Sequence, residues 1–248
     1  MVTIARFLVA SVVVACVFAL CPTPAFSQAA PPPPAREGSV EFAFIGTTGN
    51  ASTQTIGLSG EAIVRPDRWV IRNRAAFVRN ESDAELTAES FLYLFRTERV
   101  LNPRTSAFGD YAYFRDEFAG IEHRNGVLGG ISYKLVDRAA HLLSVDGGLG
   151  YLNEKRAIGP DVSSPTYAFG GTYRWKLSAT AELSEDSRFT GTFDEADDWR
   201  VANIVSVAAR LTSLFSLKAS NTIRYANAPV EGFKNTDTST AIALVAKF

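Results

Sequence analysis

One of the two histidines in the chain lies close to carboxylates, a combination that could support acid–base chemistry. His123 comes shortly after Asp116, Glu117 and Glu122. A histidine beside carboxylates can act as a general base or as a metal ligand. No serine or second histidine lies at a spacing diagnostic of a catalytic site, so we interpret His123 as a solvated histidine on an outer loop. The other histidine, His141, is expected to face outward at a membrane interface.

A second candidate is an acidic run that contains Asp194, Glu195, Asp197 and Asp198. Hard divalent cations prefer several carboxylate oxygens, but this spacing matches no EF-hand loop. We therefore expect no metal site and no cofactor, and favour a charged outer loop that contacts lipopolysaccharide through bridging cations. The glycine-rich run GGLG at 147–150 precedes no helix pattern, so it is not a phosphate loop. It predicts close strand approach or curvature instead.

Nine charged residues lie on the polar face of segments whose opposite face is apolar, which makes them candidates for lining a lumen. They are Glu61, Arg72, Arg74, Arg124, Lys134, Asp146, Arg174, Lys218 and Arg224. Basic residues outnumber acidic ones in this set, which favours a narrow, mildly anion-selective pore. The same side chains could instead fill and close the lumen through ion pairs and hydrogen bonds. The sequence leaves both interpretations open.

The elements that must position these residues are predicted strands with a period of two. In the segment 215–225, Phe215, Leu217 and Ile223 share an apolar face, and Lys218 and Arg224 lie on the opposite face. The same alternation appears at 56–64, 127–135, 143–151, 167–175 and 237–248. We expect about twelve strands, with an uncertain register at 85–98 and either one or two strands at 179–193.

Composition excludes several classes of protein. Apolar residues make up 46% of the chain and the mean hydropathy is +0.02, yet no apolar run beyond the N-terminal segment is long enough for a membrane-spanning helix. Barrels reconcile these facts because they carry apolar residues at every second position. The net charge of −1 gives no indication of nucleic-acid binding.

The N-terminal segment has the features of a secretory signal. Arg6 supplies a positive charge, residues 7–20 are apolar, and the run AFS at 25–27 offers a cleavage site. We predict a removed signal peptide at 1–27. A lipoprotein cleavage box, VVAC at 13–16, is the competing interpretation.

Both cysteines, Cys16 and Cys21, lie in this segment. The mature chain would therefore contain no disulfide, zinc–thiolate site or iron–sulfur cluster. The proline-rich stretch 28–38 is predicted to be a periplasmic spacer, and residues 39–248 are predicted to form the barrel.

Connection lengths favour a transmembrane barrel over a soluble sandwich. Short connections alternate with longer, more charged ones, as expected for periplasmic turns and outer loops. The short ones are predicted at 65–68, 101–104, 137–140, 176–179 and 211–214, and the longer ones at 46–53, 80–85, 115–123, 153–165, 185–198 and 226–236. The prolines that follow the spacer all fall in predicted connections, because proline removes a ladder hydrogen bond. We predict an all-β, antiparallel, up-and-down transmembrane barrel.

The last residues predict the closing strand of that barrel. Ile242, Leu244 and Phe248 share the outward face of the segment 237–248. The terminal aromatic resembles the signal that the barrel-assembly machinery reads. We therefore expect these three residues to act as a C-terminal assembly signal.

Three stretches resemble the salt-induced outer-membrane protein family of exported bacterial proteins. They are FRDEFAGIEHRNGVLGGISYKLVD at 114–137, HLLSVDGGLGYLNEK at 141–155 and TGNASTQTIGLSGEAIVR at 48–65. The marks are the Gly49-Asn50 turn, the Arg115-Asp116 pair, Arg124, a Gly-Gly-x-x-Tyr run and the terminal Phe. The resemblance implies an outer-membrane barrel and carries no catalytic residues. The family's name suggests a link to salt or osmotic stress.

These observations together predict a bacterial outer-membrane barrel without catalysis, which forms a narrow channel or supports envelope integrity under osmotic stress. A surface receptor or adhesin that uses the long loops is one alternative, and an outer-membrane hydrolase is another. The expected partners are outer-membrane lipids, lipopolysaccharide and the assembly machinery, with no nucleic acid. The oligomeric state stays open.

Overall fold

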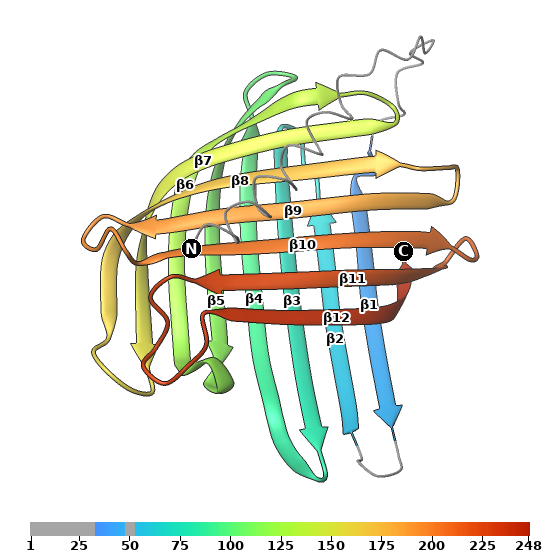
Figure 1. The fold of residues 1–248 in the computed structure, drawn as a ribbon. Coiled ribbons are helices and arrows are strands. Elements are labelled where there is room, and N and C mark those ends of the chain that lie inside the picture. The colour runs from blue at the N-terminus through green and yellow to red at the C-terminus, as the bar shows by residue number, and fades with distance from the viewer. Residues whose placement is uncertain (1–32, 48–52) are drawn as a thin grey trace.

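Twelve antiparallel strands form a closed barrel in the computed structural model, which describes residues 33–47 and 53–248. Strands adjacent in the chain are adjacent in the sheet, and β1 pairs with β12 (Figure 1). The strands are β1 Arg36–Thr47, β2 Thr53–Val64, β3 Trp69–Ser82, β4 Glu85–Val100, β5 Thr105–Asp116, β6 Ile121–Asp137, β7 His141–Arg156, β8 Val162–Lys176, β9 Ala181–Thr192, β10 Trp199–Arg210, β11 Phe215–Ala226 and β12 Thr236–Lys247. The predicted all-β, up-and-down architecture is confirmed.

One short 3-10 helix, η1 (Glu117–Ala119), follows β5. Within the described residues, no helix is long and apolar enough to cross a membrane. The predicted signal peptide at 1–27, with both cysteines, lies outside the described residues. β1 begins at Arg36, inside the stretch 28–38 that we predict to be a spacer.

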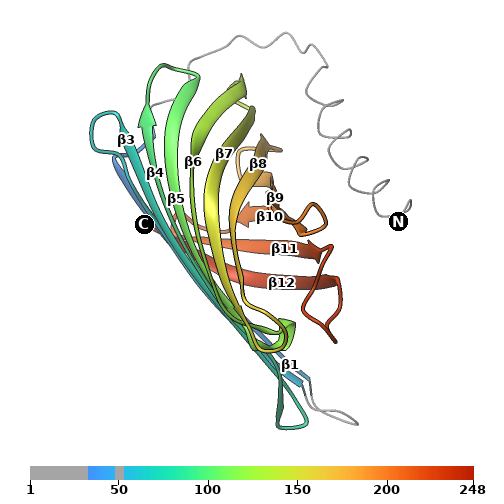
Figure 2. The same cartoon turned by 90° about the vertical axis from the view of Figure 1, so that its left-hand side faces the viewer.

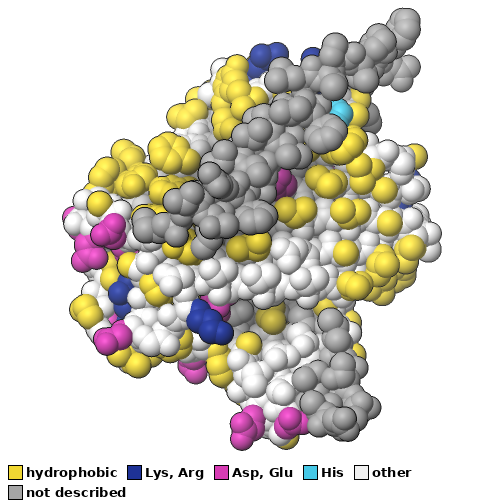
Figure 3. Space-filling model, viewed as in Figure 1, with side chains coloured by type: hydrophobic (Ala, Val, Ile, Leu, Met, Phe, Trp, Pro, Cys, Tyr) yellow, Lys and Arg dark blue, Asp and Glu magenta, His cyan; other side chains and the backbone are white. Residues whose placement is uncertain are grey.

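The barrel is apolar outside and polar inside, the inverse of a soluble domain. Leu149 and Phe169 are 65% and 60% exposed, whereas Glu154 is only 1% exposed. Apolar side chains spread over the wall that faces the viewer in Figure 3. This distribution follows from the period-two pattern, since alternate side chains of each strand point to opposite faces. It is the distribution of a membrane-spanning barrel.

Connections at one end of the barrel are short, as predicted. They lie at 65–68, 101–104, 138–140, 177–180 and 211–214. At the other end, described connections lie at 83–84, 117–120, 157–161, 193–198 and 227–235. The predicted long loop at 80–85 is wrong, because β3 and β4 meet in the two-residue turn Asp83-Ala84. Both residues have positive φ, 51° and 65°, which matches the twist of a tight hairpin.

Pro165 is a second correction, because it lies inside β8 rather than in a connection. It pairs with Tyr151 of β7, and its carbonyl accepts a hydrogen bond from the Phe193 N–H. The N–H and C=O of a strand residue point to the same side. The missing N–H therefore faces the β9 side, just beyond the end of the β8–β9 ladder at Thr166–Thr192.

The two segments of uncertain register are now resolved. β4 is one continuous strand in which Leu92 and Leu94 share the inward face with Arg96, and Phe91 and Tyr93 face outward. The segment 179–193 contains a single strand, β9.

Glycines bring β6 and β7 unusually close together. A Cβ on Gly130 would lie 2.1 Å from the Gly147 carbonyl oxygen, and a Cβ on Gly150 would lie 2.0 Å from that of Val127. The close strand approach predicted from GGLG at 147–150 is therefore confirmed. β6, β7 and β8 also curve strongly along their length (Figure 2).

The barrel closes through a short ladder between β1 and β12, which we call the seam. Residues 39–42 of β1 pair with residues 244–247 of β12. Gly38 and Phe248 extend it by exchanging two backbone hydrogen bonds of 2.8 and 3.0 Å. A Cβ on Gly38 would lie 2.6 Å from the Phe248 ring, so glycine makes room for the terminal aromatic. Beyond the seam, β1 and β12 diverge (Figure 1).

Candidate functional site: the charged lumen

Four charged side chains from four strands meet at mid-height in the lumen, and we call them the middle layer. Arg96 of β4 donates to Asp110 of β5 at 3.0 Å and to Asp146 of β7 at 3.4 Å. Arg188 of β9 lies 3.3 Å from the Asp146 carboxylate and 3.7 Å from that of Asp110. Because β4 and β9 lie far apart around the barrel, these contacts cross the lumen and narrow it.

Glycines provide the space for the middle layer. A Cβ on Gly170 would lie 2.8 Å from the Asp146 carboxylate. The Arg96 guanidinium lies 4.0 Å from the centre of the Phe108 ring, at a distance typical of cation–π contact. A Cβ on Gly148 would lie 3.2 Å from that ring. Glycines of β7 and β8 therefore allow large charged groups to lie in the lumen.

A second network, the outer layer, lies nearer the long-loop end. The Glu154 carboxylate accepts from Arg124, from Arg156 at 2.6 Å and from Arg200 at 3.3 Å. Arg200 also lies 3.0 Å from the carboxylate of Asp198, which is 3% exposed. A carboxylate this deeply buried is tolerated only when it is paired and hydrogen-bonded.

Opposite walls of the barrel also meet at the long-loop end. The guanidinium groups of Arg224 and Arg124 lie 5.1 and 5.6 Å from the centre of the Phe114 ring. A Cβ on Gly120, which has φ +73°, would lie within 3 Å of Val230 and Phe233 in the connection after β11. Val230 is 5% exposed. The connection at 227–235 therefore packs against the end of η1 and narrows this mouth.

The nine residues predicted to line a lumen have different surroundings. Asp146 belongs to the middle layer and Arg124 to the outer layer, whereas Arg224 lies 5.1 Å from the centre of the Phe114 ring. Lys218 pairs with Glu41 of β1 at 2.8 Å, and Arg72 pairs with Glu61 at 3.4 Å.

Lys134 pairs with Asp137 at 3.0 Å near the short-turn end. Among the described residues, Arg74 and Arg174 have no ion pair within 4.0 Å. That the nine residues line a conducting lumen stays a prediction.

Sequence reasoning missed most partners of these residues. The missed members of the two networks are Arg96, Asp110, Glu154, Arg156, Arg188 and Arg200, and Asp198 was assigned to a charged outer loop. Arg96 was hidden because both faces of the segment 85–98 carry apolar residues. Glu154 lies on the same face of β7 as Asp146, and this shared face was the available signal that Glu154 also points into the lumen.

His123 lies in β6 and not on an outer loop, so that prediction is wrong. It pairs with Lys155 of β7, because the β6–β7 ladder extends beyond the predicted strand end. The nearby carboxylates are engaged separately. Asp116 accepts the Ala119 N–H at 3.1 Å to cap η1, and Glu122 pairs with Lys155 at 2.9 Å.

The acidic run is also dispersed. Asp198 pairs with Arg200, and Asp194 accepts a hydrogen bond from Ser164 at 2.6 Å. Within the described part of the chain, no group of three or more His, Cys, Asp or Glu side chains is arranged to hold a metal ion. His141 bonds the Tyr173 hydroxyl through Nδ1 at 2.9 Å and stacks on Trp175.

The residues of the predicted assembly signal are exposed on the outer face near the seam. The exposed fractions of Ile242, Leu244 and Phe248 are 57%, 46% and 78%. Their recognition by an assembly machinery stays a prediction.

A family model described as "Protein of unknown function, DUF481" matches residues 40–248. No curated protein matches the chain at a significant level. Among solved structures, an outer-membrane channel described as COG4313, from Pseudomonas putida F1, is 12% identical with a TM-score of 0.52, and the match covers 92% of this chain and 100% of that one. The NanC porin is 9% identical with a TM-score of 0.51, and the match covers 84% and 98%. At these identities, the likeness concerns the fold.

Proposed function

This chain belongs to the DUF481 family, and we propose that it forms a narrow, non-catalytic channel in a bacterial outer membrane. The observation that carries the proposal is the inversion of polarity across the barrel wall, with ionised networks inside and exposed aliphatic and aromatic residues outside. A barrel with an apolar outer face suits a bilayer, and a hydrated, charged lumen suits small polar solutes.

Two charged layers in series would set the selectivity of this channel. In the middle layer, Arg96 and Arg188 face Asp110 and Asp146, and Arg96 also donates to Glu98 at 2.8 Å, so the carboxylates outnumber the arginines by one. In the outer layer, three arginines face two carboxylates, so the excess is one positive charge. We therefore expect the outer layer, where arginines are in excess, to give a mild preference for anions at the long-loop end, because rings of arginine favour anions in pores.

The proposal includes a route to the membrane. The segment 1–27 would direct export and be removed, and Ile242, Leu244 and Phe248 would be read during assembly into the outer membrane. The charged outer connections would contact lipopolysaccharide. A role in salt or osmotic stress is the physiological part of the proposal, and loss of growth at high salt on deletion of the gene would test it.

Single-channel recording in planar bilayers tests the channel. We expect small, weakly anion-selective conductance from the wild type, and larger conductance from Arg188→Ser because the middle layer is then open on the β9 side. Asp146→Asn should increase anion preference. Glu122→Gln, which alters only an exposed pair with Lys155, is the matched control.

Silence of the wild type and of an Arg96→Ser/Arg188→Ser double variant, in a preparation that shows heat-modifiable gel migration, would reject the channel. It would favour a sealed barrel that supports the envelope.

A further inference from the structure

The seam joins only one end of β1 to β12, and the remainder of both strands forms a fork. Pairing stops at Phe42 and Leu244. From there, residues 43–47 of β1 and 236–243 of β12 have no ladder partner across the gap in the part of the chain that the structure describes. Both strands keep their other neighbours, β2 and β11. Figure 1 shows the two strands running apart from the seam toward the long-loop end.

The first five residues of β12 differ from the rest of the strand. Residues 236–240 read Thr-Asp-Thr-Ser-Thr and are exposed on both faces, whereas exposure alternates from Ala241 to Val245. The outward face that carries Ile242 and Leu244 continues with Thr236, Thr238 and Thr240. A lipid-facing strand would carry apolar residues at these three positions. Residues 236–240 of β12 are therefore polar on their edge and on both faces.

The fork lies at the depth of the membrane and not above it. Thr240 pairs with Asn221 of β11, and Thr236 pairs with Tyr225. The outward face of β11 continues through Ile223, which is 41% exposed, beside these threonines. The outward apolar run of β12, from Ile242 to Phe248, covers about 20 Å of strand, or roughly 14 Å of height at a 45° tilt, against an apolar band of about 25 Å.

Free strand edges at this depth need a polar environment. Each unsatisfied backbone group in hydrocarbon costs several kcal/mol, so such edges persist only where they line water or protein. Polar groups continue onto the neighbouring wall, where Asn221 donates to Thr240 at 2.9 Å and Asn203 donates to Glu185 at 3.1 Å. The fork is thus a polar slot, and it is continuous with polar residues on β9, β10 and β11.

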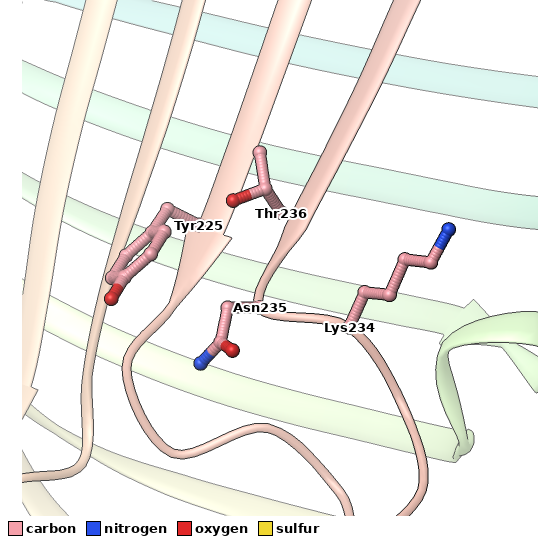
Figure 4. Close-up of a pocket in the computed structure, with 4 residues that line it drawn as sticks. All are labelled: Tyr225, Lys234, Asn235 and Thr236. Atoms are coloured by element: carbon pink, nitrogen blue, oxygen red, sulfur yellow. The ribbon is translucent and has the colours of Figure 1, made fainter. Parts of the chain in front are cut away.

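The two ends of the slot differ in character. At its narrow end, Lys218 Nζ donates to both oxygens of Glu41, at 2.8 and 3.1 Å, and joins β11 to β1 across β12. At its wide end, a shallow pocket is lined by Tyr225, Lys234, Asn235 and Thr236 (Figure 4). A lysine and a tyrosine at the level of the lipid headgroups suit a polar or anionic head.

We infer that this slot is a lateral portal through which a single-chain amphiphile exchanges between the outer leaflet and the lumen. The headgroup enters between the free edges of β1 and β12, and the acyl chain follows it into the lumen. The Lys218–Glu41 pair limits how far the seam opens. This inference rests on the proposed channel, since the lumen must be continuous with water for the headgroup to pass.

The first test asks whether water reaches the slot. The thiols introduced by Thr240→Cys and Ala219→Cys would both face outward. Ala219, however, has a strand partner on both sides, Val207 on β10 and Ile242 on β12. A charged, membrane-impermeant maleimide should label Thr240→Cys in vesicles and leave Ala219→Cys unlabelled. Equal protection of both would overturn the portal. So would spontaneous disulfide dimers of Thr240→Cys, which would show that a second copy covers the edge.

The second test measures passage. Vesicles that contain the barrel and entrapped albumin receive a fluorescent lysophosphatidylcholine outside, and external albumin then removes the probe that has not crossed. Joining Ala43→Cys to Ala243→Cys, by a disulfide or a short bismaleimide, closes the first open position of the fork. We expect this lock to reduce transfer to the rate of protein-free vesicles, and a reducible lock to be reversed by thiol.

A matched lock, Val40→Cys with Ala246→Cys, joins residues that are already paired and should leave transfer unchanged. Conductance is recorded on the same preparations. Conductance without transfer, or transfer insensitive to the Ala43–Ala243 lock, refutes the portal and leaves the channel standing. Absence of both refutes the channel as well.

Discussion

Replacement of Glu154 tests how the outer layer holds the barrel together. Its carboxylate is 1% exposed and contacts Arg124, Arg156 and Arg200. Glu154→Gln keeps the shape but leaves these guanidinium groups without that negative charge. Loss of one partner from a buried ionic network costs about 3–5 kcal/mol. Because the three arginine side chains are 13–22% exposed, we expect about 3 kcal/mol, or roughly a 150-fold change in the folding equilibrium.

Guanidinium denaturation in lipid vesicles, followed by heat-modifiable gel migration, measures this change. With a slope of about 3 kcal/mol per molar, the midpoint should fall by about 1 M. Glu122→Gln is the control, since its pair with Lys155 is 42% and 51% exposed and such pairs contribute about 0–1 kcal/mol. Equal midpoints for the two variants would show that burial does not strengthen the Glu154 contacts, and would refute the reasoning.

Three further substitutions test backbone geometry, each read out by folded-barrel yield or by the denaturation midpoint. Gly130→Ala would place a Cβ 2.1 Å from the Gly147 carbonyl oxygen and should abolish the folded barrel. Gly129→Ala is the control and should fold normally, because its Cβ would be 3.8 Å from the nearest atom. Equal yields of folded barrel from the two variants would contradict the close approach of β6 and β7. Gly38→Val should weaken the seam by displacing the Phe248 ring. Adding Phe248→Ala in the same chain should recover part of the lost stability. Strictly additive effects of the two substitutions would argue against contact between residue 38 and the Phe248 ring. Ala84→Gly should raise the free energy of unfolding by about 0.5–1 kcal/mol, because Ala84 has φ 65° and only glycine adopts this conformation without strain. A lower denaturation midpoint for this variant would show that the turn is not strained.

The strands were predictable because a period of two is a local property of the sequence. The segment predicted at 215–225 corresponds to β11, Phe215–Ala226, and its polar face carries Lys218 and Arg224. Turn chemistry was less visible. Asp83-Ala84 contains neither glycine nor asparagine, so a tight hairpin with two positive φ angles carried no local signal.

The partners inside the lumen could not be predicted from local pattern. Arg96 and Asp146 are 50 residues apart in the chain, and Lys218 and Glu41 are 177 apart. Such pairs depend on the register of every ladder between them, and on glycines that remove side chains from the path. Two residues on the same face of different strands are therefore candidates for contact, but their distance is fixed only by the closed barrel.

The seam also has a consequence for the order of folding. Every other ladder joins strands that follow one another in the chain, so each can form as a hairpin. The seam instead joins the first and last strands of the barrel through only a few paired residues. We therefore expect closure to follow formation of the hairpins, and until it occurs the curved sheet presents two free edges that must be kept from pairing with other chains.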